Sequence, residues 1–187
     1  VTYGGTNNEG ARQIIQTSDG GYAIIGYTYS YGGGGRDMWL IKTDNNGKEE
    51  WSKTYGLGNQ DYGFSVWETE DGNYIVTATT LRASVSHQYQ LIKVDNNGAI
   101  IWDRTYGGSE SDEVFRGAQQ TADGGIVMIG MTTTFGEGAN DMFMVKTDAD
   151  GVSGDCHNGA VTTTETTATT IVSVTSLSVV NTGISEA

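Results

Sequence analysis

The fold is decided by the stretch Thr17-Ser18-Asp19-Gly20-Gly21-Tyr22-Ala23-Ile24-Ile25-Gly26. Its Asp-Gly-Gly signature precedes a nearly continuous apolar run, as in a tight hairpin that joins two strands. The signature returns at a spacing of 52 residues as Asp71-Gly72-Asn73, and at the same spacing again as Asp123-Gly124-Gly125. This recurrence predicts one structural unit that is used three times.

Two further motifs keep the same period. The Lys-Thr-Asp-Asn-Asn-Gly motif of residues 42–47 recurs at 93–98 and 146–151, and the Thr-Tyr-Gly motif of residues 2–5 recurs at 54–56 and 105–108. A period of about 51 to 52 residues favours propeller blades over solenoid coils, whose repeats have roughly 20 to 30 residues.

Each period is expected to contain four strands. In the first period they are Ala11 to Thr17, Tyr22 to Tyr29, Met38 to Thr43 and Glu49 to Tyr55. Asp-Gly and Asp-Asn-Asn-Gly supply the positive-φ positions of short turns, so the longer connections should gather at the opposite end. The second and third strands are apolar throughout, which is typical of sheets covered on both faces.

The predicted fold is therefore all-β and of the β-propeller type. It has three four-stranded blade repeats, at about 1–56, 57–108 and 109–151, followed by a Thr-, Ser- and Val-rich tail at 152–187 that forms a strand or a linker. Propellers typically have four to eight blades, so the chain is expected to be part of a larger propeller or of an assembly. Thr2 to Gly5 is expected to be a strand that completes an open blade, and Ala160 to Val180 to be a strand docked on a blade edge.

The repeats resemble the Trp-containing blade repeats of secreted bacterial and archaeal β-propeller proteins. The shared pattern is T-x-D-G-G-Y-x-I-x-G, then I-K-T-D-x-x-G, then W-x-x-T-Y-G-G, across residues 1–151. The tail is similar to those of large Bacteroidota surface proteins that follow the type IX secretion route. The resemblance implies a secreted, extracellular or cell-surface protein.

Composition excludes several classes of partner. The formal net charge of −13 is spread along the chain, which disfavours nucleic acid and anionic lipid. The apolar runs are far shorter than the roughly 18 residues of a membrane-spanning helix, so no membrane insertion is expected. Cys156 is the single cysteine and forms no intrachain disulfide.

The Asp-x-Asn/Asp-Gly turns have two interpretations. Alternating carboxylate and amide oxygens before a glycine can bind Ca²⁺, and Asp148, Asp150 and Asp155 fit this best. The same residues are also expected where side chains cap a tight turn. The spacing from Asp44 to Trp51 and from Asp95 to Trp102 resembles the docking repeat of quinoprotein propellers and the Asp-box of sialidase propellers. In both families the motif is structural, so we predict no catalytic residue and no enzyme activity.

The longer connections are the predicted binding surface, since aromatic rings beside carboxylates and amides suit a glycan or a surface protein. The candidate ligand-binding residues are Tyr29, Tyr31, Arg36, Asp37, Asp61, Arg82, His87, Asp112, Asn140 and Asp141. The leading hypothesis is a non-catalytic repeat protein that displays these loops. The alternatives are a structural subunit that self-associates through strand edges and tail, and a sialidase- or quinoprotein-like enzyme.

Overall fold

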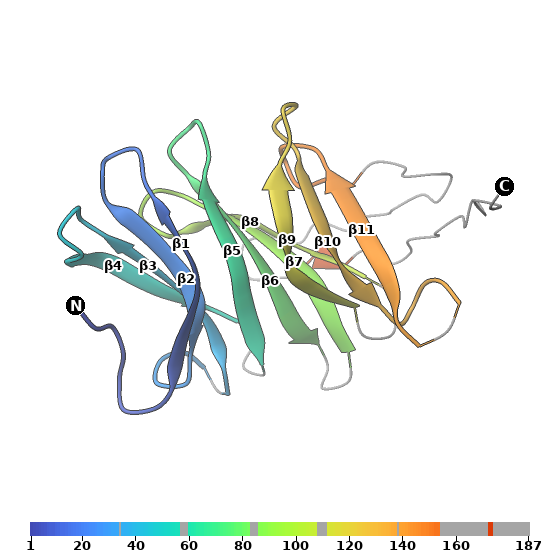
Figure 1. Ribbon diagram of the computed structural model, residues 1–187, viewed down its shortest axis with the longest axis horizontal. Coiled ribbons are helices and arrows are strands. Elements are labelled where there is room, and N and C mark those ends of the chain that lie inside the picture. The colour runs from blue at the N-terminus through green and yellow to red at the C-terminus, as the bar shows by residue number, and fades with distance from the viewer. Residues whose placement is uncertain are drawn as a thin grey trace, which may run out of the picture.

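The computed structural model describes residues 1–33, 35–56, 60–82, 86–107, 112–137, 139–153 and 172–173. These residues form an all-β structure in which eleven strands build three antiparallel sheets (Figure 1). The sheets stack as three layers, with the middle sheet between the other two. The described part of the chain forms an open stack and does not close into a ring.

Each sheet is an up-and-down meander in which neighbours in sequence are neighbours in space. The first sheet contains β1 (Glu9–Gln16), β2 (Tyr22–Thr28), β3 (Asp37–Thr43) and β4 (Glu49–Tyr55). The middle sheet contains β5 (Asp61–Glu68), β6 (Tyr74–Arg82), β7 (Ser86–Val94) and β8 (Ile100–Tyr106). The third contains β9 (Asp112–Gln120), β10 (Ile126–Thr132) and β11 (Asp141–Thr147). The four strands predicted for the first period are confirmed, with ends that differ by one or two residues.

The tight turns form as the sequence predicts. At the first one, the amide of Gly20 donates to the carbonyl of Thr17 at 2.9 Å, and Gly20 has a φ of +87°. The carboxylate of Asp19 accepts from the amide of Gly21 at 2.9 Å and pairs with Lys42 of β3 at 2.7 Å. The same ion pair joins Asp71 to Lys93 at 2.9 Å and Asp123 to Lys146 at 3.0 Å.

Two apolar cores hold the three layers together. Ala23, Ile25, Met38 and Leu40 of the first sheet pack against Val66, Val76, Ala78 and Ile92 of the middle sheet. The other face of the middle sheet, with Ile75, Tyr89, Leu91 and Tyr106, packs against Ile126, Met128, Phe143 and Val145 of the third. The middle sheet is therefore covered on both faces, as its apolar strands predict.

The two ends of the chain are each expected to form a strand. Residues 2–5 are not a strand but irregular chain alongside the first sheet, held there because the hydroxyl of Tyr3 donates to the carbonyl of Gly47. In the tail, the described part is β12 (Val172–Ser173), which pairs in parallel with Arg104 and Thr105 of β8. The rest of the segment expected to be a strand, Ala160 to Val180, lies outside the described residues.

Candidate functional site

The longer connections lie at one end of the sheets, which we call the loop end. Because each sheet is antiparallel, the links from β2 to β3 and from β10 to β11 lie opposite the tight turns (Figure 1, lower end). A parallel bridge between Arg36 and Gln60 joins the first and middle sheets at this end, and the amide of Asp61 donates to the carbonyl of Arg36 at 2.8 Å. The predicted gathering of the long connections is confirmed.

The densest group of candidate residues is centred on the guanidinium of Arg36. Its central carbon lies 3.8 Å from the ring centre of Tyr62, 5.0 Å from that of Tyr27 and 5.1 Å from that of Tyr29. These distances are within the range of cation–π attraction. We call these four residues the Arg36 cluster.

The Arg36 cluster is polar at its edge. Nη2 of Arg36 donates to Oε1 of Gln60 at 3.3 Å, and the hydroxyl of Tyr62 donates to the same oxygen at 2.9 Å. Tyr29 remains 38% exposed, so part of its ring faces solvent. The cluster therefore combines aromatic surface, a fixed positive charge and an amide at one place.

Asp37 and Asp61 are candidate residues that the structure places in the interior beneath the cluster. Both are buried, and a methyl group added at Gly56 would come within 2.5 Å of a carboxylate oxygen of each. The hydroxyl of Thr80 donates to Asp61. Only glycine leaves room for both carboxylates at position 56.

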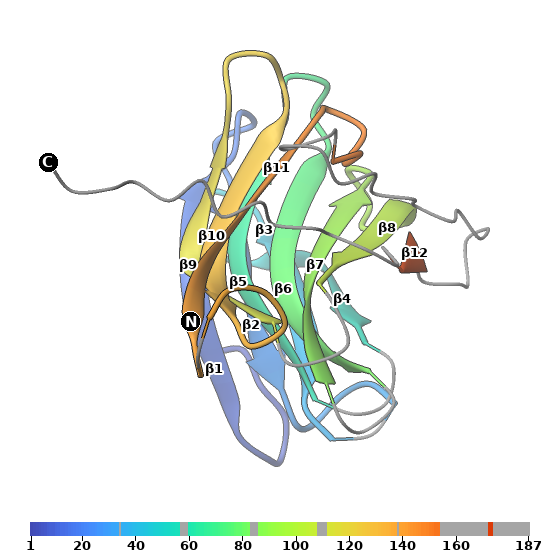
Figure 2. The ribbon, with the colours of Figure 1, turned by 90° about the vertical axis from the view of Figure 1, so that its right-hand side faces the viewer.

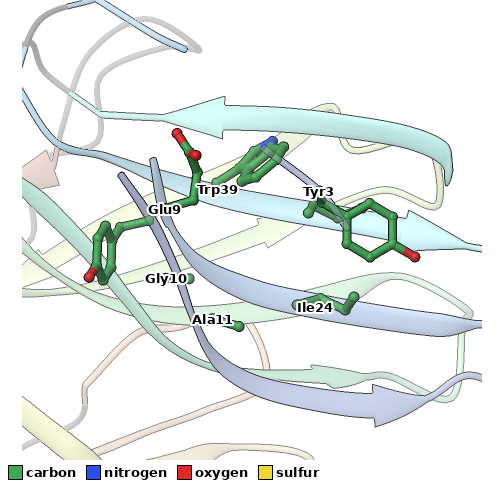
Figure 3. Close-up of a pocket in the computed structure, with 9 residues that line it drawn as sticks. Tyr3, Glu9, Gly10, Ala11, Ile24 and Trp39 are labelled. Atoms are coloured by element: carbon green, nitrogen blue, oxygen red, sulfur yellow. The ribbon is translucent and has the colours of Figure 1, made fainter. Parts of the chain in front are cut away.

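Tyr31 belongs to a different surface, the outer face of the first sheet. Its ring centre lies 5.4 Å from that of Trp39, and its hydroxyl donates to the carbonyl of Gly4 at 3.1 Å. Beside it, Tyr3, Ala11, Ile24 and Trp39 border a pocket of about 120 Å³ (Figure 3).

Glu9 forms the polar rim of this pocket. Its carboxylate accepts from the hydroxyl of Thr28 at 3.0 Å and from the amide of Gly5 at 3.3 Å. Side-chain hydrogen bonding, first from Ser30 and then from Thr28, holds the pKa of Glu9 below its ordinary value. The rim therefore carries a negative charge, while the interior of the pocket is apolar.

The remaining candidates do not join the Arg36 cluster. His87 lies half-buried in β7 opposite Leu81, and Asp141 approaches Gly136 in the third sheet as Asp37 approaches Gly32 in the first. Asn140 is exposed just before β11. Arg82 and Asp112 are placed by their backbone at the end of β6 and the start of β9, and their side chains lie outside the described part of the structure.

The Asp-x-Asn/Asp-Gly motifs form tight turns in which the aspartate side chain accepts from the turn's backbone amides. Oδ1 of Asp148 accepts from the amides of Asp150 at 2.9 Å and Val152 at 2.8 Å, and Asp44 makes the equivalent pair of bonds. These backbone bonds, first from Lys48 and then from Asn46, lower the pKa of Asp44. Asp155 lies outside the described residues, among which no group of three acidic, His or Cys side chains is arranged to hold a metal ion.

Sequence reasoning missed Tyr27 and Tyr62 as members of the cluster. Tyr27 and Tyr29 are two residues apart in an extended segment, so side-chain alternation predicts that they lie on the same face. No comparable signal brings Tyr62 to Arg36, because that contact depends on how two sheets stack.

No protein-family model matches this chain, and a comparison with curated proteins finds no match. In the described part of the chain, no helix has the length and apolarity needed to cross a membrane.

Proposed function

We propose that this chain is a non-catalytic, extracellular repeat protein of the β-propeller type that binds a glycan at its loop end. The observation that carries the proposal is the Arg36 cluster, where three tyrosine rings surround one guanidinium at the junction of two sheets. Sugars present apolar CH patches beside hydroxyl groups, and this combination matches exposed aromatic surface beside hydrogen-bonding groups.

The position of the cluster supports binding. Tyr27 lies in β2 and Tyr29 directly after it, Arg36 lies directly before β3, and Tyr62 lies in β5. The Arg36–Gln60 bridge joins the two sheets at this point. A site built across two packed sheets is rigid before a ligand arrives, so binding loses little conformational entropy.

The tryptophans of the Asp-x-x-Gly-x-x-x-Trp motifs support a structural rather than a catalytic role for these motifs. Nε1 of Trp51 donates to the carbonyl of Asn96, in the next sheet's turn, at 3.0 Å. The ring of Trp102 lies against Gly151 as that of Trp51 lies against Gly98. Both side chains therefore serve packing between sheets.

A glycan array probed with the intact chain tests the proposal, followed by titration of the best-bound glycan. We expect Tyr29→Ala to weaken binding at least about tenfold, the loss of roughly 1.4 kcal/mol. Tyr22→Ala, a change in the same strand at the opposite end, should leave affinity unchanged. An intact chain that binds no glycan, or a Tyr29→Ala variant with full affinity, overturns the proposal. Capture of a protein ligand that depends on Tyr29 would assign the loop end to protein binding.

A second candidate function is a structural subunit joined through strand edges and tail. The pairing of β12 with the β8 edge favours it, because it shows a tail segment adding to a sheet. Removing residues 160–187 should then expose surface that binds a hydrophobic dye or changes the oligomeric state. A truncated chain that is dye-silent, equally stable and unchanged in mass would contradict this function.

A further inference from the structure

The outer face of the third sheet exposes three large apolar side chains. Met142 is 87% exposed, Met144 60% and Ile129 43%. They lie on β10 and β11, on the side of the stack that faces the viewer in Figure 2. A contiguous exposed apolar face of this kind marks a site of association.

The repeats show what normally covers such a face. By strand register, Ile129 and its partner Met144 are equivalent to the pair Ile25 and Leu40 in the first sheet and to Thr77 and Leu91 in the middle sheet. All four equivalents are 0% exposed, because the next sheet of the stack covers them. The third sheet thus presents a surface that is buried wherever another sheet follows.

The outer face of the first sheet carries the equivalents of the residues that, in the middle sheet, pack against the preceding sheet. Its paired residues Ile14 and Ile24 are equivalent to Val66 and Val76 of the middle sheet. Val66 and Val76 are fully buried, because they pack against the first sheet. Ile14 is 58% exposed, and Ile24 lines the pocket shown in Figure 3. The two ends of the stack therefore carry the two halves of an interface that occurs twice inside the chain.

We propose that a second copy of this chain docks head to tail, with the outer face of its first sheet against the outer face of the third sheet. The pocket is the expected seat for Ile129 and Met142. In the inner interface, Ile25 and Met38 reach over Gly63, where an added methyl group would come within 2.6 and 2.9 Å of them. The residue equivalent to Gly63 in the first sheet is Ala11, which borders the pocket. Because Ala11 carries a methyl group, Ile129 and Met142 must lie farther from the docked sheet than Ile25 and Met38 lie from Gly63.

In the described part of the chain β11 is an edge strand of the third sheet, and this edge fits the same arrangement. In the other two sheets the residue equivalent to Met142 pairs with a tyrosine of the fourth strand, as Met38 with Tyr55 and Tyr89 with Tyr106. In the docked copy the hydroxyl of Tyr3 donates to the carbonyl of Gly47. In the same way, the hydroxyl of Tyr55 donates to the carbonyl of Gly98 in the next sheet. Docking therefore brings Tyr3 of the second copy opposite Met142, where its segment completes the third sheet.

This interface is heterologous, so repetition gives a ring if the rotation closes and an open filament if it does not. The net charge of −13 on each copy opposes association, and salt screens that repulsion. The pocket shares Tyr27 with the Arg36 cluster. The docking uses neither Arg36, Tyr29 nor a bound glycan, so the variants at Ile14, Met142 and Met144 test it separately from glycan binding.

Sedimentation velocity of the intact chain over a concentration series, in high salt, tests the proposal. The intact chain should form species larger than the monomer. A Met142→Lys, Met144→Lys double variant and an Ile14→Lys variant should each stay monomeric, because each has lost one half of the interface. Mixing them should restore 1:1 dimers, because each variant keeps the half that the other lacks. Ile101→Lys, at an exposed position of β8, is the control and should associate like the intact chain.

Four outcomes overturn the proposal. An intact chain that is monomeric at every concentration has no such interface. A mixture of the two variants that stays monomeric excludes the head-to-tail pairing, and an Ile14→Lys variant that still dimerises indicates a third-sheet face paired with itself. Association that appears only after residues 154–187 are removed would assign the face to the chain's own tail. Circular dichroism of each variant establishes that the fold is retained.

Discussion

The hydroxyl of Tyr55, at the end of β4, donates a hydrogen bond of 2.8 Å to the carbonyl oxygen of Gly98, in the turn between β7 and β8. The bond crosses from the first sheet to the middle one. It is repeated where Tyr106 donates to Gly151, and where Tyr3 donates to Gly47. Burial raises the pKa of Tyr55, so the phenol remains a donor at physiological pH.

Loss of this bond should destabilise the stack. Tyr55→Phe keeps the ring and leaves a buried carbonyl at Gly98 without its donor, so we expect a loss of about 1 kcal/mol in the free energy of unfolding. Denaturant melts followed by fluorescence measure it. Tyr62→Phe, at the loop end, is the control and should change stability by less. Equal effects for both variants would mean that the contact between the sheets contributes nothing specific.

Two glycines with the same backbone conformation should respond differently to alanine. Gly98 and Gly72 have φ of +78° and +74°, so Ala is strained at both. At Gly98 an added methyl group would also come within 2.9 Å of the Trp51 ring, whereas at Gly72 nothing lies within 4 Å. Gly98→Ala should therefore lower the denaturation midpoint more than Gly72→Ala does. Equal midpoints would show that Trp51 does not pack on the turn.

The resemblance of the Asp-x-x-Gly-x-x-x-Trp motifs to structural propeller motifs predicts that Trp51 and Trp102 are buried between blades. The structure shows both side chains half-buried against the next sheet's turn. Full burial would make Trp→Ala cost about 3 to 5 kcal/mol, so half-burial predicts about 2 kcal/mol for Trp51→Ala. Trp51→Phe, which keeps most of the contact area, is the matched variant and should cost less. A loss below about 0.5 kcal/mol for Trp51→Ala, within the range of ordinary surface substitutions, would contradict the packing role.

Stability should fall in acid through the repeated ion pairs at the tight turns. Hydrogen bonds from Thr69 and then Lys93 lower the pKa of Asp71. A lowered pKa in the folded state means that the stabilisation is complete above the unfolded value of about 3.9 and is lost as pH falls through the folded value. Denaturation midpoints should therefore drop below about pH 4. Asp71→Asn should lower the midpoint at pH 7 and flatten this drop, whereas Glu70→Gln, at the exposed neighbouring position, should leave both nearly unchanged.

The strands and turns could be read from the chain because their causes are local. Asp19-Gly20-Gly21 and its two counterparts fix where hairpins turn, and apolar runs such as Ala23-Ile24-Ile25 fix which segments are covered on both faces. The expectation for Thr2 to Gly5 was wrong in one respect. The Tyr3 hydroxyl does donate to a turn carbonyl as those of Tyr55 and Tyr106 do. Among the described residues, however, no strand pairs with residues 2–5, so their backbone joins no ladder.

The sequence by itself determined the all-β class, the repeat period, the strand bounds and the loop end, because turn chemistry and side-chain alternation act within a few residues. The tertiary structure decided which face of each sheet is covered, that Asp37 and Asp61 are buried, and that Arg36 meets Tyr62. It also decided that Met142 and Met144 are exposed while their repeat equivalents are buried. The physical reason is that burial depends on the next layer, and nearly identical strands differ only in whether a sheet lies against them.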